Sequence, residues 1–186
     1  MHCSPDEAVA LVQTRLEPLS GTRWVGVDGL GAAGKTTLAA RLAAALPGAV
    51  VVAVDDFARP LVRGWDRDRF TAQLLEPLLA GRTARYQRWD FDADTGAEWA
   101  EVRPGHPVVV EGVSATDVRV PVPWDLTLWV DVPREERRRR AYARDGAERW
   151  PRWVTDWFPS EEAYEAEQRP QDRVDLVVDA FAQPSP

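Results

Sequence analysis

A glycine-rich stretch near the start of the chain constrains the fold more than any other feature. Residues 29–36 read GLGAAGKT and fit the pattern G-x-x-x-x-G-K-[ST]. A short apolar segment at residues 24–28 precedes the stretch, and an alanine- and leucine-rich segment at residues 35–46 follows it. Glycines in such a loop let backbone N–H groups converge on an anion beside the positive end of a helix. The pattern therefore predicts a strand, a phosphate-binding loop and a helix, which is the start of an α/β fold.

Each part of this pattern has its own task at a bound nucleotide. The lysine reaches the β- and γ-phosphates, and the hydroxyl of Thr36 is a ligand for Mg²⁺. Lys35 is the only lysine in the chain. The residues predicted to bind the nucleotide, whose base is left open, are Gly29, Gly31, Ala32, Ala33, Gly34, Lys35, Thr36 and Thr37. A glycine-rich turn with an incidental lysine is the alternative, and the flanking strand and helix argue against it.

The rest of the chain alternates apolar and helical segments. Residues 50–54, 107–113, 126–132 and 174–178 are short apolar runs, and the first contains four valines in five positions. Runs without polar alternation are typical of parallel strands covered on both faces. Helices are predicted between Ser4 and Gly21 and at residues 66–79, 133–145 and 160–169. Residues 83–103 are expected to form a hairpin or another ordered excursion outside the core. The sequence therefore indicates a P-loop NTPase fold, a three-layer, doubly wound parallel sheet of about five strands.

Composition limits the partners of this chain. It has 186 residues, a net charge of −7 and one cysteine. The length fits one domain, which we assign to residues 1–182, followed by a polar tail at residues 183–186. A single cysteine excludes an internal disulfide, so a cytoplasmic protein is expected. The acidic balance argues against a nucleic acid polymer as partner, and no apolar run approaches the roughly 18 residues of a membrane helix. The expected partners are a nucleotide and a small molecule, and an oligomeric state is left open.

Acidic residues follow two of the predicted strands. Asp55 and Asp56 come directly after residues 50–54, and Glu111 lies within the apolar run of residues 107–113. The carboxyl ends of parallel strands meet at the ligand-binding edge of such a sheet. One carboxylate there can accept a proton from an attacking hydroxyl, and another can hold Mg²⁺ or its water. The structural alternatives are aspartates that cap a turn and a glutamate bonded to nearby amides.

An arginine-rich segment is the third candidate element. Residues 134–144 contain six arginines in an otherwise acidic chain. On a helix, Arg137, Arg140 and Arg144 share one face. Such a row suits a lid over a polyphosphate, where it would neutralise charge during transfer. We therefore assign a lid to about residues 133–160, with a solvated helix face bearing ion pairs as the alternative.

In this order the segments resemble the uridine kinase-like branch of P-loop small-molecule kinases. The similarity covers most of the chain. Its segments are the loop at residues 29–36, VDDF at 54–57, WDRDRF at 65–70, YQRWD at 86–90, VEG at 110–112, DVP at 131–133 and the arginine segment. The sequence departs from that family at Ala58, where tyrosine is usual, and at residues 88–92, which replace a histidine-containing stretch.

The resemblance implies a division of tasks among the candidate residues. Asp55 would orient and deprotonate an acceptor hydroxyl, although Asp56 stays open as the base, and Thr36, Glu111 and Asp55 would support Mg²⁺. The residues expected to stabilise the transferring phosphoryl group are Lys35, Arg140 and Arg144. The residues expected near the acceptor are Asp56, Phe57, Tyr86, Trp89 and Arg137.

The activity that the resemblance implies is transfer of the γ-phosphate of ATP, with Mg²⁺, to a hydroxyl of a small molecule. A nucleoside such as uridine or cytidine is the favoured acceptor. A sugar, a pantothenate-like alcohol or an antibiotic hydroxyl stays open, because Ala58 and residues 88–92 depart from the family. The rival from another class is a nucleotide-binding switch or ATPase, and the lid-like arginine helix argues against it.

Overall fold

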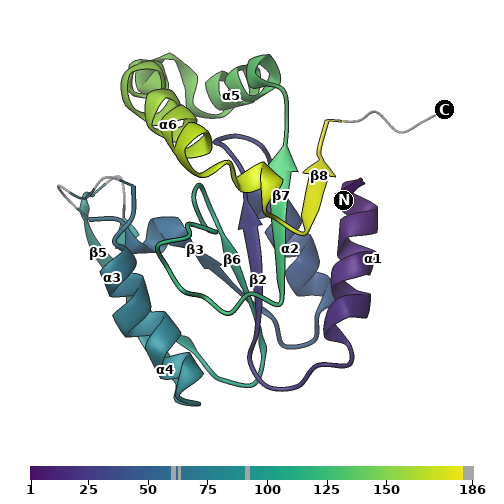
Figure 1. Ribbon diagram of the computed structural model, residues 1–186. Helices are drawn as coiled ribbons and strands as arrows, with labels where there is room; N and C mark the ends of the chain where they lie inside the picture. The colour runs from purple at the N-terminus through teal and green to yellow at the C-terminus, as the bar shows by residue number, and fades with distance from the viewer. Residues whose placement is uncertain (60–61, 63, 91–92, 182–186) are drawn as a thin grey trace.

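The structure is a computed structural model that describes residues 1–59, 62, 64–90 and 93–181 (Figure 1). Six parallel strands form one sheet in the order β1-β8-β7-β2-β6-β3. The strands are β1 (His2–Cys3), β2 (Arg23–Asp28), β3 (Val50–Ala53), β6 (Pro107–Glu111), β7 (Leu126–Asp131) and β8 (Leu176–Asp179). The predicted α/β architecture and its five strands are confirmed. The sixth strand, β1, was missed because two residues are too few to show a pattern.

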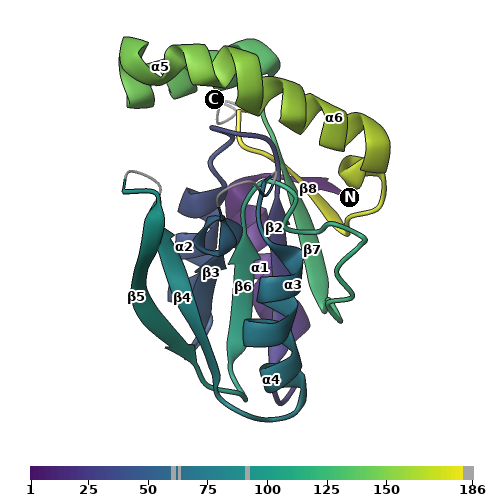
Figure 2. The same cartoon turned by 90° about the vertical axis from the view of Figure 1, so that its left-hand side faces the viewer.

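Helices cover both faces of the sheet, so the molecule has three layers (Figures 1 and 2). On one face lie α1 (Pro5–Leu16) and α2 (Lys35–Ala45). On the other face, α3 (Arg67–Phe70), a π-helical turn η2 (Thr71–Leu75) and α4 (Glu76–Leu79) form one rod. Neighbouring strand residues belong to opposite cores: Val109 packs with α1 and α2, whereas Val108 and Val110 pack with the rod. This is the two-residue period of a strand buried on both sides.

Local signals in the sequence set the ends of the helices. The Ser4 hydroxyl accepts a hydrogen bond from Glu7 N at 3.3 Å, and the Glu7 carboxylate accepts one from Ser4 N at 2.8 Å, so α1 begins with the expected capping box. Asp66 accepts a hydrogen bond from Arg69 N at 2.9 Å and starts α3. Pro77 is accommodated in the first turn of α4, directly after the π-turn, where its missing N–H is not needed.

The predicted hairpin is an antiparallel pair of β4 (Ala84–Asp90) and β5 (Thr95–Val102). The expectation that it lies outside the core is wrong for one of its faces. Ala84, Tyr86 and Val102 are buried and pack with the rod of α3 and α4. The sequence does not show this inward face, because Ala84 is small and Tyr86, two positions later, carries a polar hydroxyl group.

A helical cover lies across the carboxyl edge of the sheet (Figures 1 and 2). It comprises α5 (Arg134–Arg152), a π-helical turn η3 (Trp153–Trp157) and α6 (Phe158–Gln168). Gly146, with φ 70° and ψ −173°, interrupts α5, so the arginine-rich helix predicted for residues 133–145 is confirmed. The cover continues through residue 168, because the helix predicted at residues 160–169 forms as α6.

A short 3-10 turn, η4 (Pro170–Asp172), joins the cover to β8. Two assignments from the sequence fall outside the described residues: the tail at residues 183–186, and Phe91 and Asp92 in the hairpin. Within the described ranges, no helix has the length and apolarity required to cross a membrane.

Candidate active site

The predicted phosphate-binding loop joins the end of β2 to the start of α2. Gly29 has a φ of 147°, and a Cβ there would lie 2.7 Å from the carbonyl oxygen of Val130. Gly34 has a φ of 104° and is the N-cap of α2, and Ala32 also has a left-handed backbone, with a φ of 60°. Left-handed residues within a turn are typical of backbone nests, in which successive N–H groups bind one anion. The loop therefore has the backbone geometry that its sequence predicts.

Lys35 lies beneath this loop as a buried cation. Lys35 is 7% exposed, and its Nζ donates a hydrogen bond to the Leu30 carbonyl at 2.9 Å. Burial lowers the pKa of Lys35, while nearby carboxylates, of which Glu161 and Glu111 act most strongly, oppose this effect. The lysine is thus held by surrounding negative charge at the point where the loop would receive a phosphate.

Thr36 and Glu111 form the candidate Mg²⁺ position. The Thr36 hydroxyl donates a hydrogen bond to Glu111 Oε1 at 3.0 Å. Glu111 is 6% exposed at the end of β6, and burial raises its pKa, against the opposing effects of Lys35 and Thr36. Among the described residues no three histidine, cysteine or acidic side chains gather as a metal site. Mg²⁺ in phosphate sites uses few protein oxygens together with phosphate and water, so this hydroxyl and carboxylate fit it.

Asp55 and Asp56 lie in a 3-10 turn, η1 (Val54–Phe57), that follows β3. The protein surrounding Asp55 desolvates it and raises its pKa, and the positive charges of Lys35 and Arg144 partly offset this shift. The Asp55 residue still keeps an exposed surface. Asp56 instead accepts a hydrogen bond from the Tyr86 hydroxyl at 3.2 Å and lies 3.5 Å from Arg88 Nε. Asp55 therefore shares the electrostatic environment of the phosphate loop, and Asp56 belongs to the hairpin side.

The three candidate arginines of α5 have different surroundings. Arg140 donates hydrogen bonds to the carbonyl oxygens of Ala33 in the loop, at 3.3 Å, and of Ala180, at 3.4 Å. Arg144 pairs with Asp145 at 2.9 Å, and its charge also lowers the pKa of Asp55. Arg137 is 6% exposed, and its Nη1 lies 3.6 Å from a Glu161 carboxylate oxygen. The structure thus brings Arg140 and Arg144 toward the loop and Asp55, and it directs Arg137 to Glu161.

The residues predicted near the acceptor are only partly available to a ligand. Phe57 and Tyr86 are stacked, with ring centroids 4.8 Å apart, and both rings are buried in the core. Tyr86 consequently reaches the site only through its hydroxyl group on Asp56. Trp89, further along β4, is half-buried. Arg69, a residue without an assigned role, donates hydrogen bonds to the carbonyl oxygens of Asp56 and Ala58 and fixes the turn that carries both aspartates.

Two acidic residues at the site were missed. Asp28, at the end of β2, is fully buried and accepts hydrogen bonds from the backbone of Gly29, Ser114 and Thr116 and from the hydroxyls of Thr116 and Tyr164. Its place directly before the loop is a signal that sequence reasoning had available. Glu161 accepts a hydrogen bond from Gly31 N at 2.9 Å across 130 positions of sequence, and nothing in its acidic helix marks it.

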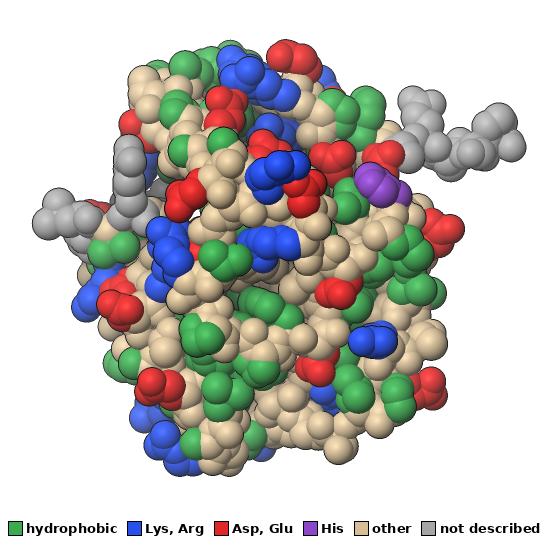
Figure 3. Space-filling view, in the orientation of Figure 1, with side chains coloured by type: hydrophobic (Ala, Val, Ile, Leu, Met, Phe, Trp, Pro, Cys, Tyr) green, Lys and Arg blue, Asp and Glu red, His purple; other side chains and the backbone are tan. Residues whose placement is uncertain are grey.

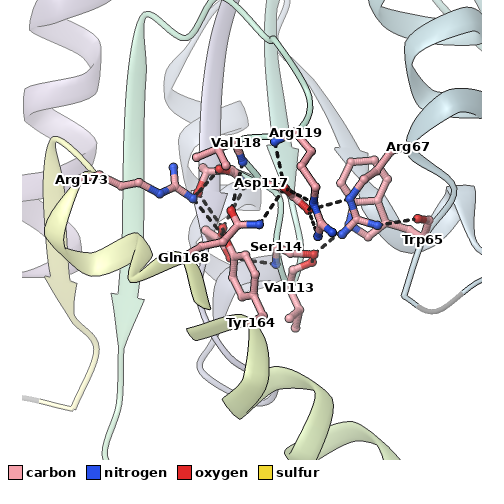
Figure 4. Close-up of polar contacts among 12 residues, drawn as sticks. Trp65, Arg67, Val113, Ser114, Asp117, Val118, Arg119, Tyr164, Gln168 and Arg173 are labelled. Carbon is pink, nitrogen blue, oxygen red and sulfur yellow. Dashed lines mark hydrogen bonds and ion pairs between the residues drawn. The ribbon is translucent and has the colours of Figure 1, made fainter. Parts of the chain in front are cut away.

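A polar network joins the cover to α3 and to the loop that follows β6 (Figure 4). Asp117, in the loop after β6, accepts hydrogen bonds from Arg67 Nε of α3 at 2.6 Å and from Gln168 Nε2 of α6 at 2.9 Å. Arg119 adds further bonds to the same carboxylate. Trp65 donates to the Ser114 hydroxyl at 3.0 Å in the same region. The network therefore fixes α3, α6 and the loop between β6 and β7 to one another.

The strand order and the phosphate loop define a P-loop kinase-like fold. One similar structure is that of a possible uridine kinase from Bacillus stearothermophilus, with a TM-score of 0.68 and 19% identity over 94% of this chain and 98% of that one. Another is a candidate fructose transport system kinase from Silicibacter sp. TM1040, with a TM-score of 0.64 and 22% identity over 94% and 98%. No family model matches this sequence, and no curated protein matches it. These likenesses establish the fold, and the function rests on the site.

Proposed function

We propose that this protein transfers the γ-phosphate of ATP to a hydroxyl group of a small molecule, in a reaction that uses Mg²⁺. The observation that carries the proposal is a convergence of charge. Three adjacent strands carry the charged and polar groups. The loop after β2 leads to Lys35 and Thr36, and Glu111, which bonds Thr36, ends β6. Asp55 follows β3, and the charge of Lys35 acts on it. Phosphoryl transfer requires mainly positioning and charge compensation, and these residue types supply both.

Each side chain has a task in this reaction. The loop N–H groups and Lys35 bind the phosphates, and Arg144 adds positive charge from the cover. Asp55 orients the acceptor hydroxyl and accepts its proton, because it is the aspartate of the pair on which the charges of both Lys35 and Arg144 act. Thr36 and Glu111 would hold Mg²⁺, which neutralises charge on the phosphate oxygens. A raised pKa brings Asp55 closer to the range in which a carboxylate acts as a base.

The acceptor we favour is a nucleoside, bound between η1 and the β4–β5 hairpin. The order of motifs and the similarity to a possible uridine kinase support this choice. A sugar is the second candidate, since a candidate fructose transport system kinase is similar to a comparable extent. The net charge of −7, with acidic and basic side chains interspersed on the face seen in Figure 3, suits a small acceptor better than a polyanion.

The decisive experiment measures ADP release with Mg-ATP, with and without a panel of nucleosides, sugars and pantothenate. Each stimulating compound is then checked by mass for one added phosphate. We expect stimulation by one acceptor class, and Lys35→Ala should abolish turnover and weaken nucleotide binding, because it removes the buried cation at the phosphates. Arg139→Ala is the control, since the Arg139 side chain is 70% exposed and its ion pair among the described residues is with Glu136 of the same helix. ADP release that no acceptor changes, or an active Lys35→Ala variant, would contradict the proposal.

A further inference from the structure

The helical cover is packed directly on the phosphate loop. Gly31 N donates a hydrogen bond to Glu161 Oε2 of α6 at 2.9 Å. A Cβ on Gly31 would lie 2.5 Å from the other Glu161 oxygen and 2.6 Å from the Trp153 ring. Glu161 itself is 6% exposed. No space for another group therefore separates Glu161 from the amide of Gly31.

The charges around Glu161 are those that a phosphate requires. Glu161 is the foremost of the carboxylates that oppose the lowering of the Lys35 pKa by burial, so its negative charge is felt at the lysine. Arg137 Nη1 lies 3.6 Å from the same oxygen that accepts from Gly31, and it has no hydrogen-bond partner among the described residues. A backbone amide of the loop thus donates to this carboxylate, an arginine lies beside it, and the charge of a lysine acts on it.

We propose that Glu161 is an internal competitor of the nucleotide phosphate, so that α6 must release Gly31 before a phosphate can occupy the loop. This inference rests on the proposed function, because it assumes that the loop binds phosphate. Two anions repel each other strongly in a partly desolvated site, and a carboxylate on the Gly31 amide blocks both the space and the charge that a phosphate would use. The contact between Glu161 and Gly31 therefore holds the cover closed over the loop and weakens nucleotide binding.

The neighbouring residue Glu162 provides a matched control on the same helix. Its side chain is 43% exposed and pairs with Arg134 at 2.7 Å, away from Gly31. Replacing Glu162 by glutamine removes the same formal charge from the next position of α6. A general effect of net charge on anion binding would appear in Glu162 variants, whereas competition at the Gly31 amide would not.

The test is calorimetric titration of the full chain with pyrophosphate and with ADP. Glu161→Gln and Glu161→Ala should each bind both ligands at least about tenfold more tightly than the wild type, the low end expected for a hydrogen bond to a charged group. Glu162→Gln should stay within about twofold. Circular dichroism and thermal melting confirm that each variant is folded, and the glutamine variant retains the size of the side chain if the alanine variant does not fold.

The outcomes separate this inference from the proposed function. If the wild type binds pyrophosphate and folded Glu161 variants bind it equally or more weakly, the competitor role is overturned while the phosphate site stands. If the tightening occurs equally in Glu162→Gln, the effect is general charge and the competitor role is again overturned. If neither the wild type nor any folded variant binds either ligand, the proposed function fails, and the inference fails with it.

Discussion

At the scale of the residue, Asp55 and Asp56 show how adjacent carboxylates acquire different tasks. The charges of Lys35 and Arg144 act on the pKa of Asp55, whereas Asp56 accepts a hydrogen bond from Tyr86 and lies near Arg88. The dipeptide was recognisable in the sequence as a strand-end pair. The sequence does not show which aspartate is affected by the charges beside the phosphate loop, because this depends on the η1 turn, and Arg69 fixes that turn from another element.

This difference predicts unequal effects of two conservative substitutions. Asp55→Asn should lower kcat at least about a hundredfold, the low end for a positioned acid–base group, and leave ATP affinity nearly unchanged. Asp56→Asn should affect kcat less and the KM for the acceptor more, because Asp56 belongs to the hairpin side. Steady-state kinetics with both substrates and ATP titration provide the measurements. A larger loss of kcat in Asp56→Asn would reverse the assignment.

Glu161 marks the limit of sequence reasoning for the site. The loop residues, Thr36, Glu111 and Asp55 were predictable because a motif or a strand end marks each of them. Glu161 contacts Gly31 across 130 positions, and only the way α6 folds back over the loop brings them together. Arg137 was correctly placed on the helix by its spacing, but that spacing could not show that its partner is Glu161.

At the scale of the element, the interruption of α5 positions its charged end. Gly146 breaks the helix directly after Asp145, which accepts a hydrogen bond from Trp153 Nε1 at 2.7 Å and pairs with Arg144. The second part of the cover therefore folds back onto the end of the first. The sequence predicts the end of the first helix at residue 145, but it does not predict that helical structure resumes after Gly146 and continues into η3.

Gly146→Ala tests this break. A residue with φ 70° and ψ −173° is in a region that only glycine adopts readily, so alanine should lower the free energy of unfolding by about 1–3 kcal/mol. Among the described residues, a Cβ there would meet no atom within 4 Å beyond its chain neighbours and the adjacent helix backbone, so the expected cost is one of backbone conformation. Urea unfolding of both proteins measures the difference. Equal stability would show that residue 146 is not held in this conformation.

Arg144→Ala tests the role of the cover in the reaction. Arg144 is paired with Asp145 and its charge acts on Asp55, so its loss should lower kcat by more than it weakens ATP binding. A fall of at least about tenfold in kcat is expected, a modest share of what a transition-state arginine contributes. The Arg139→Ala control should leave both constants unchanged. An effect confined to ATP affinity would argue against a contribution of Arg144 to the transfer step.

At the scale of the whole molecule, the layered sheet was predictable and the connection between its layers was not. Five apolar runs and the loop motif define the sheet, because parallel strands covered on both faces are apolar throughout. Asp117 instead joins α3, α6 and the β6–β7 loop through side chains from distant parts of the chain (Figure 4). Such long-range polar contacts leave no periodic signal.

Asp117→Asn should therefore destabilise the whole molecule in a pH-dependent manner. Burial tends to raise the pKa of Asp117, but hydrogen bonds from Arg119, Gln168 and Arg67 outweigh it and hold this pKa well below its ordinary value. A carboxylate with a lowered folded-state pKa stabilises the fold above its unfolded pKa, near about 3.9, and loses that contribution as pH falls toward the folded value. At pH 7 we expect a loss of about 2 kcal/mol, typical of hydrogen bonds to a charged group.

Urea unfolding at a series of pH values measures this effect. The difference between the wild type and Asp117→Asn should be greatest at neutral pH and shrink as the pH falls below about 3.9. Asp156→Asn, at an exposed position in η3, serves as the control and should cost little at any pH. A difference that is independent of pH would mean that the charge on Asp117 is not what holds the network together.

The central position of β2 in the sheet affects how the chain folds during its synthesis on the ribosome. This strand carries the phosphate loop, yet it gains its first neighbour only when β6 has been synthesised, and its second only with β7. The valine-rich β3 also pairs with β6 and waits for it. Unpaired apolar strands invite association between chains. A growing chain therefore exposes β2 and β3 without their partner strand until residue 111 has been synthesised, and its risk of association depends on how quickly the ribosome passes from residue 54 to residue 111.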